Sequence, residues 1–137
     1  MNKFVEKKRT PKRASVYTGV VIQGDGEAGR DFDVPTANLA LRPLPRIRHG
    51  IYAASVEFAD HLMRGIVSWG ATSGKMHKFE VHLFDFEGDL VGKTLSVTLL
   101  KRVGEWIPWT SKERMRQKIW NDIAAAHEWF AQQEKKG

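Results

Sequence analysis

The chain places several short β-forming segments one after another, with no helical segment between them. Runs rich in Val, Ile, Tyr and Phe, bounded by Gly, Pro or Asp, predict strands. They cover residues 16–23, 51–58, 63–69, 79–86 and 95–99. Parallel strands need long crossovers that are usually helical, so a parallel sheet is disfavoured. Five or six short antiparallel strands favour a small barrel, because closure removes the exposed strand edges.

The end of the chain changes from strand to helix periodicity. Thr110 and Glu113 match the capping-box pattern, with Thr110 as the N-cap residue. Apolar residues then recur at intervals of three and four, at positions 115, 119, 123, 126 and 130. The sequence therefore predicts one amphipathic helix over residues 111–133 that packs against the barrel.

Composition limits the chemistry available to the chain. Its 137 residues suit one domain with a core, and the absence of cysteine excludes disulfides, thiol catalysis and cysteine-bound metals. Apolar runs all fall short of the roughly 20 residues of a membrane helix. The N-terminus also lacks the apolar core of a secretory signal. We therefore expect a cytoplasmic monomer without membrane association.

The positive net charge is concentrated at the N-terminus. Residues 1–13 hold six basic side chains and one acidic side chain, a net +5 of the total +6. We expect residues 1–14 to form a basic disordered tail and residues 15–137 to form the barrel domain with its helix. Because the domain itself is almost neutral, the charge does not favour nucleic acid as the main partner.

A glycine-rich segment follows the first predicted strand, inside what reads as a long loop over residues 24–44. It contains Gly24, Gly26, Gly29 and Arg30. Glycine lets a backbone approach a ligand closely, and successive backbone N–H groups form a concave anion site. The segment therefore predicts phosphate binding. The alternative is a glycine-rich hairpin that leads into an irregular loop.

Pro35-Thr36-Ala37-Asn38 comes directly after this segment. In extended backbone Thr36 and Asn38 point to the same side. A hydroxyl and an amide oxygen are hard ligands that Mg²⁺ accepts together with phosphate oxygens. The motif therefore predicts that these two residues bind a metal–phosphate group.

Glu80 lies in the middle of the clearest predicted strand, where Phe79 and Val81 alternate with Glu80 and His82. Strand propensity does not favour a carboxylate there. On the barrel interior or at its mouth, burial would raise the pKa of Glu80, which could then accept a proton from a substrate hydroxyl. The alternative is that Glu80 and His82 occupy a solvated face.

These motifs, with their order and spacing, resemble the riboflavin kinase family over about residues 16–130. The resemblance implies an all-β-dominated fold, a six-stranded antiparallel Greek-key β-barrel with one C-terminal α-helix. It rests on Gly19, Gly24 to Arg30, Pro35-Thr36-Ala37-Asn38-Leu39, Gly50-Ile51-Tyr52-Ala53, Gly65-Ile66-Val67, Glu80-Val81-His82-Leu83-Phe84-Asp85-Phe86, Gly88-Asp89-Leu90, Gly92, Ile119 and Asp122.

The resemblance also implies an activity, the transfer of the ATP γ-phosphate to the 5′-hydroxyl of riboflavin to give FMN and ADP. By position, Thr36 and Asn38 match the family's magnesium and phosphate ligands, and Glu80 matches its general base. Residues 24–30, with Pro35, match its nucleotide site. In many bacteria this domain is fused to an FMN adenylyltransferase domain, for which this chain has no room, so we expect the kinase reaction alone.

Departures from the family pattern cluster at the end that borders the flavin in the family. Val103-Gly104-Glu105-Trp106 stands where the family has Leu-Arg-x-Glu, with Arg102 nearby. Trp106 and Trp109 are candidates for a wall on which a flavin ring stacks; the alternative is that they are core aromatics. Two other hypotheses stay open: a non-catalytic flavin- or nucleotide-binding module on the same barrel, and a kinase for another hydroxylated substrate.

Overall fold

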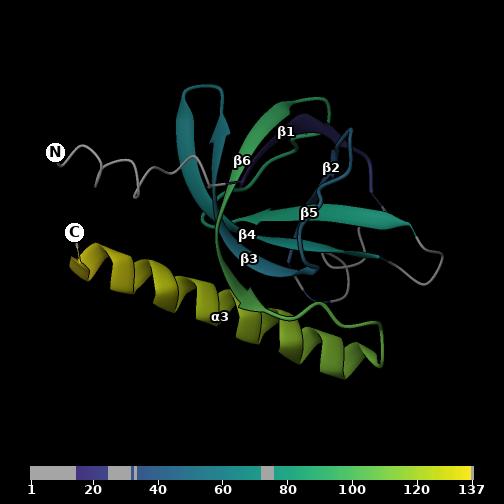
Figure 1. Ribbon diagram of the computed structural model, residues 1–137, viewed down its shortest axis with the longest axis vertical. Coiled ribbons are helices and arrows are strands. Elements are labelled where there is room, and N and C mark those ends of the chain that lie inside the picture. Colours follow the sequence, from purple (N-terminus) through teal and green to yellow (C-terminus); the bar gives the residue numbers. More distant parts are fainter. Residues whose placement is uncertain (1–14, 25–31, 33, 72–75, 137) are drawn as a thin grey trace, which may run out of the picture.

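The computed structural model describes residues 15–24, 32, 34–71 and 76–136. It shows a closed barrel with one long helix packed along its outside (Figure 1). The expected tail, residues 1–14, lies outside the described residues, as do Gly26, Gly29 and Arg30. Within the described part of the chain, no helix has the length and apolarity that a membrane span requires.

Six strands form the barrel in the order β1-β2-β5-β4-β3-β6, and every neighbouring pair is antiparallel. This confirms the predicted six-stranded antiparallel barrel with one C-terminal helix. The elements are β1 (Ser15–Ile22), β2 (Ala37–Ala40), β3 (Gly50–Phe58), β4 (His61–Ala71), β5 (His77–Leu83), β6 (Thr94–Gly104) and α3 (Lys112–Lys136).

The prediction of a single loop over residues 24–44 is wrong, because β2 lies within it. β2 has only four residues, too few for a periodic signal, and its pairing depends on partners distant in sequence. Val21 of β1 lies opposite Leu39, and Glu80 of β5 lies opposite Asn38. The predicted strand over residues 79–86 also ends early, since β5 stops at Leu83 and the chain then turns.

Two hydrophobic clusters lie on opposite sides of the barrel wall. The interior cluster contains Val67, Val81 and Val97, together with Trp69 and Phe79. Because side chains alternate along a strand, the even-numbered residues of β5 face outward. The second cluster fills the space between the outer face of β3 and β4 and α3; it comprises Phe32, Val34, Ile51, Ala53, Ile66, Phe84, Ile123, Ala126 and Phe130.

Helix α3 begins one residue later than predicted. The Ser111 hydroxyl accepts a hydrogen bond from the Arg114 backbone N–H at 3.2 Å, and the Ser111 carbonyl accepts one from Met115 N–H at 3.0 Å. Ser111 is therefore the N-cap, and the prediction of Thr110 was wrong. Both residues have the oxygen that a cap requires, so sequence alone does not separate two adjacent candidates.

We expect Ser111→Ala to lower the free energy of unfolding by about 1 kcal/mol, because one N-terminal N–H of the helix loses its acceptor. Thr110→Ala is the matched control and should change the stability by less than about 0.5 kcal/mol. Urea denaturation followed by circular dichroism measures both. A larger loss in the Thr110 variant would contradict the assignment of the cap.

Candidate active site

A cavity of about 570 Å³ opens beside the ends of β1, β2 and β5. One wall comes from the segment that leads into β2, and the opposite wall from the turn after β5. Its polar lining comprises Gln23, Gly24, Thr36, Asn38, His82, Glu87, Gly88 and Asp89. Four residues of the predicted nucleotide site, Gly24, Pro35, Thr36 and Asn38, therefore line one cavity.

Gly24 and Asn38 are in direct contact across this cavity wall. Asn38 is 8% exposed, and a Cβ atom built on Gly24 would overlap the Asn38 Nδ2 atom. The Asn38 amide thus occupies the space that a side chain at position 24 would need. The sequence analysis expected glycines in this segment to let the backbone approach a ligand. At Gly24 the structure shows that the group in close contact is the amide of Asn38.

Glu80 lies on the outer face of the barrel, not on the interior or at the mouth as we had considered. Its ladder partners are Asn38 on β2 and Ser68 on β4. Directly opposite residues have Cβ atoms about 5 Å apart, so the three side chains are neighbours on one face. Glu80 is half-buried and does not itself line the cavity, but Asn38 and His82 do.

The donor set at this place suits magnesium. Thr36 offers a hydroxyl oxygen and Asn38 an amide oxygen, which are hard ligands that Mg²⁺ accepts together with phosphate oxygens. The described residues contain no group of three or more His, Asp or Glu side chains that could hold a metal. A cation bound here would therefore take most of its ligands from phosphate oxygens and water, as Mg²⁺ does in phosphate sites.

His82 connects the two halves of the site, and sequence reasoning had considered it only as a residue of a solvated face. Its Nδ1 atom lies 2.7 Å from the Pro35 carbonyl oxygen. Because a carbonyl only accepts, Nδ1 donates this hydrogen bond. The sequence did predict that His82 and Glu80 share one face, because they are two residues apart on an alternating strand. The contact with Pro35 required the pairing of β2, which the sequence did not reveal.

Two tryptophans stand near the same outer face. A Cβ atom on Gly70 would overlap the Trp106 indole, so Trp106 lies directly on the backbone of β4. Trp109 is 59% exposed and stacks on Phe32 with a centroid distance of 6.4 Å. Neither tryptophan belongs to the two core clusters. The exposure of Trp109 argues against a role as a core aromatic.

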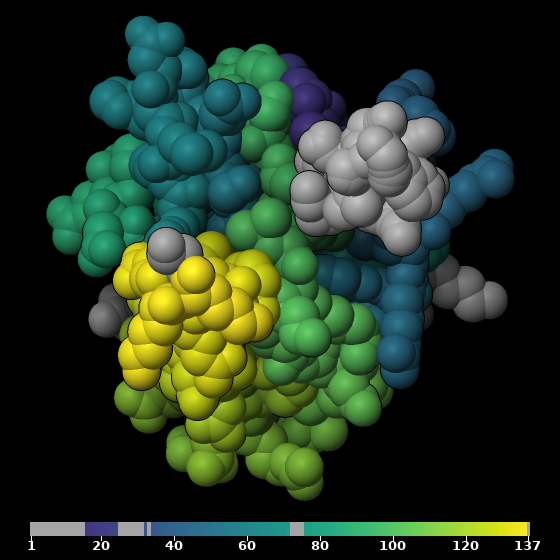
Figure 2. Space-filling view, turned by 60° about the vertical axis from the view of Figure 1, so that its left-hand side comes forward, coloured from purple at the N-terminus to yellow at the C-terminus, as the bar shows by residue number. Residues whose placement is uncertain are grey.

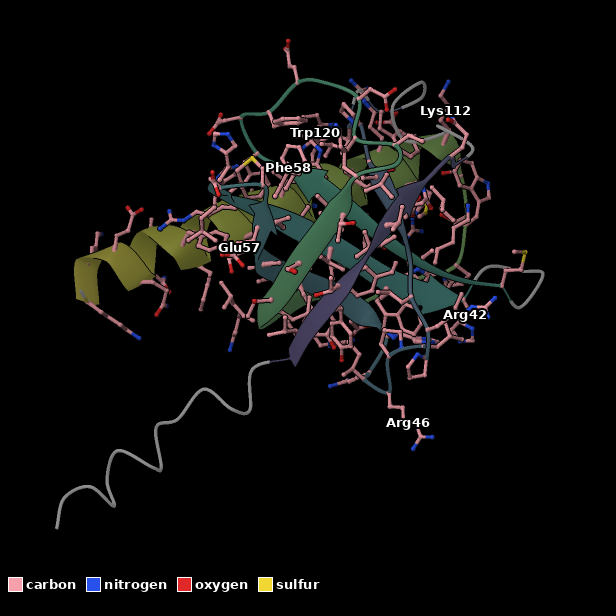
Figure 3. All side chains as sticks on the ribbon, turned by 90° about the horizontal axis from the view of Figure 1, so that it is seen from above. Arg42, Arg46, Glu57, Phe58, Lys112 and Trp120 are labelled. Atoms are coloured by element: carbon pink, nitrogen blue, oxygen red, sulfur yellow. The ribbon has the colours of Figure 1, made fainter. Side chains whose placement is uncertain are left out.

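Phe32 is held from a second side by α3. The Trp120 indole N–H donates to the Phe32 carbonyl at 3.3 Å, and Figure 3 shows Trp120 on the helix. Phe32 and Val34 are buried among Ile123, Ala126 and other residues of the second cluster. The segment that leads into the cavity wall is therefore anchored to the helix.

A buried carboxylate of α3 lies beside the end of β6. Asp122 of α3 is 8% exposed and forms an ion pair of 2.6 Å with Lys118. Burial raises the pKa of Asp122, and Lys118 opposes that shift. A Cβ atom on Gly104 would overlap the Asp122 carboxylate, so a side chain at this strand position would have to displace it. Arg102 is engaged elsewhere, donating to the His49 carbonyl at 2.8 and 3.2 Å.

Comparison with known proteins decides the family. The family model for riboflavin kinase, named Flavokinase, matches residues 11–130. This chain belongs to the riboflavin kinase family. The match covers the cavity, β5 with Glu80 and most of α3, so the riboflavin kinase barrel described above is the family domain.

Curated relatives of this riboflavin kinase domain are two-function proteins. A bifunctional riboflavin kinase/FMN adenylyltransferase from Buchnera aphidicola is 30% identical over 135 residues, which is 94% of this chain and 43% of the relative. The protein of the same name from Escherichia coli is 32% identical over 117 residues, 82% of this chain and 37% of the relative. The chain thus spans about two fifths of the length of these relatives.

Solved structures share the fold. A crystal structure of a macrolide-efflux protein from Streptococcus pneumoniae has a TM-score of 0.70 and 30% identity, covering 83% of this chain and 38% of that chain. The crystal structure of riboflavin kinase from Trypanosoma brucei has a TM-score of 0.61 and 16% identity, covering 85% and 79%. At that lower identity the likeness concerns the barrel and helix alone.

We expect Gly24→Ala to lower the free energy of unfolding by about 1–3 kcal/mol, because the new methyl group displaces the Asn38 amide. The neighbouring Gln23→Ala changes an exposed side chain and should stay within about 0.5 kcal/mol of the parent protein. Thermal or urea unfolding measures both variants. Equal stability of the two variants would disprove the tight contact between Gly24 and Asn38.

Proposed function

We propose that this chain transfers the γ-phosphate of ATP to the 5′-hydroxyl of riboflavin and releases FMN and ADP. The observation that carries the proposal is the position of Glu80 directly opposite Asn38, beside the cavity that Thr36 lines. Phosphoryl transfer requires an aligned hydroxyl nucleophile next to a neutralised phosphate. Family membership supports this reaction, and it does not favour a non-catalytic binding module.

The phosphate side of the proposed reaction uses the cavity. The Thr36 hydroxyl and the Asn38 amide oxygen hold the metal-bearing phosphates, with Pro35 and Gly24 shaping the wall. When bound, Mg²⁺ neutralises the charge on the phosphate oxygens. Gly26, Gly29 and Arg30, outside the described residues, complete the proposed nucleotide site in the segment between Gly24 and Phe32.

Glu80 is the proposed general base. Its carboxylate accepts the proton of the 5′-hydroxyl as the oxygen attacks the γ-phosphorus, and this kind of catalysis requires hydrogen-bond reach between base and nucleophile. Asn38 lies directly opposite Glu80 on the neighbouring strand, so the Cβ atoms of these two residues are about 5 Å apart. The ladder between β2 and β5 therefore positions the proposed base beside one of the two proposed phosphate ligands.

Trp106 and Trp109 are the proposed flavin contacts. Gly70, which Trp106 covers, is two residues along β4 from Ser68, the ladder partner of Glu80. Strand rise and spacing put this place about 8 Å from Glu80 along the outer face. A five-carbon ribityl chain can span such a distance, which supports a flavin ring near the tryptophans when the 5′-hydroxyl is at Glu80.

We expect Glu80→Gln to reduce the turnover number at least about 100-fold, because the amide cannot accept the hydroxyl proton. The assay contains riboflavin, ATP and Mg²⁺, and FMN and ADP are quantified by chromatography. Glu57→Gln on β3 is the control for the loss of one surface carboxylate (Figure 3) and should keep full activity. Full activity in the Glu80 variant would remove Glu80 from the mechanism.

We expect Trp109→Leu to raise the KM for riboflavin about fivefold and to leave the KM for ATP unchanged, because one stacking contact contributes about 1 kcal/mol. Leu62→Ala removes another exposed apolar side chain, at 72% exposure, from the start of β4. Both KM values should stay at the parental level in that variant. A change in the KM for ATP alone would argue against a flavin contact at Trp109.

A further inference from the structure

The segment that contains Thr36 lies beyond the end of the ladder between β2 and β5. β2 begins at Ala37, and its pairing with β5 comprises only Ala37 with Val81 and Asn38 with Glu80. Pro35 has no backbone N–H to donate. Backbone pairing with β5 therefore does not extend to Pro35 and Thr36, the two cavity-lining residues that precede Ala37.

A side chain replaces the missing ladder bond. The Nδ1 atom of His82 donates to the Pro35 carbonyl at 2.7 Å, so β5 holds this segment through an imidazole. The ring of His82 also contacts Phe84 edge to face, with centroids 5.9 Å apart, and Phe84 stacks on His127 at 4.0 Å. These contacts restrict the ring on one side while the hydrogen bond fixes it on the other.

We propose that His82 is a positioning residue that holds the Pro35–Thr36 segment in the geometry needed to bind the magnesium–nucleotide complex. This rests on the kinase function proposed above. Glu80 and His82 share one face of β5. A single strand thus sets the position of the base directly and that of the Thr36 hydroxyl through one hydrogen bond. Movement of β5 shifts both together, which preserves their separation.

The proposal assigns no proton transfer to His82. Nδ1 carries a hydrogen in the neutral tautomer that donates to Pro35 and also in the protonated ring. The bond to the carbonyl is therefore kept whether or not the ring gains a proton at its other nitrogen. This distinguishes His82 from Glu80, whose proposed role requires a change of protonation state.

Three substitutions separate the hydrogen bond from the ring. His82→Asn places an amide N–H close to the position of Nδ1 and keeps the donor. His82→Gln places its amide nearer the position of Nε2, and His82→Phe keeps a ring without a donor. The affinity of the 137-residue chain for ADP with Mg²⁺, measured by calorimetry, reports on the phosphate site without any turnover.

We expect His82→Phe and His82→Gln to weaken binding of ADP with Mg²⁺ about fivefold to tenfold, the contribution of one hydrogen bond. His82→Asn should stay within about twofold of the parent, and the KM for riboflavin should not change in any of the three. His127→Asn is the matched control: it removes an imidazole from the Phe84 stack, has no contact with Pro35 in the described structure, and should leave ADP affinity unchanged.

Equal ADP affinity in the parent, His82→Phe and His82→Gln would overturn the proposal, as would an Asn variant as weak as the Phe variant. A raised KM for riboflavin in all three variants would indicate that the substitutions disrupt the whole site, and this result would also overturn the proposal. A parent chain that binds ADP with Mg²⁺ but forms no FMN would refute the kinase function instead. A parent that does not bind ADP would refute both.

Discussion

The antiparallel pairing of β2 between β1 and β5 is the interaction on which the site depends. These four residues close the barrel. They also bring Asn38, forty-two positions earlier in the chain, directly opposite Glu80. A shift of one residue in this register would turn the Asn38 side chain toward the interior. Closure of the fold and assembly of the proposed phosphate site are therefore the same event.

The inner and outer faces of the barrel wall contribute differently to stability and to the proposed site. The interior is filled by apolar side chains and gives the barrel its stability. The outer face is divided: α3 covers Ile51, Ala53 and Ile66, while Asn38, Glu80 and Ser68 remain beside the cavity and the tryptophans. Figure 2 shows the helix and the end of β6 forming one continuous surface on one side of the molecule. The proposed base Glu80 and the proposed phosphate ligand Asn38 thus lie on strands, and the helix covers a neighbouring part of the outer face.

Sequence alone predicted the features that depend on local patterns. The period-two alternation around Val81 identified β5, and the apolar spacing from position 115 to 130 identified α3 to within a few residues. The phosphate motif and Glu80 were proposed from residue type and from resemblance, and they stay predictions. Features that depend on distant partners were missed: the four-residue β2 and the bond from His82 to Pro35. No local pattern encodes these, because each requires the pairing of strands far apart in the chain.

The anchoring of Phe32 has a consequence for how the protein is made. Phe32 and Val34 are buried against Ile123, Ala126 and Phe130, and the Phe32 carbonyl binds the Trp120 indole. The chain leaves the ribosome from its N-terminus, so the barrel strands emerge before these helix residues exist. A nascent chain that ends at residue 110 contains all six strands but lacks the surface that holds the approach to the cavity. The proposed nucleotide site, encoded early in the sequence, therefore gains this support only after the helix has been synthesised.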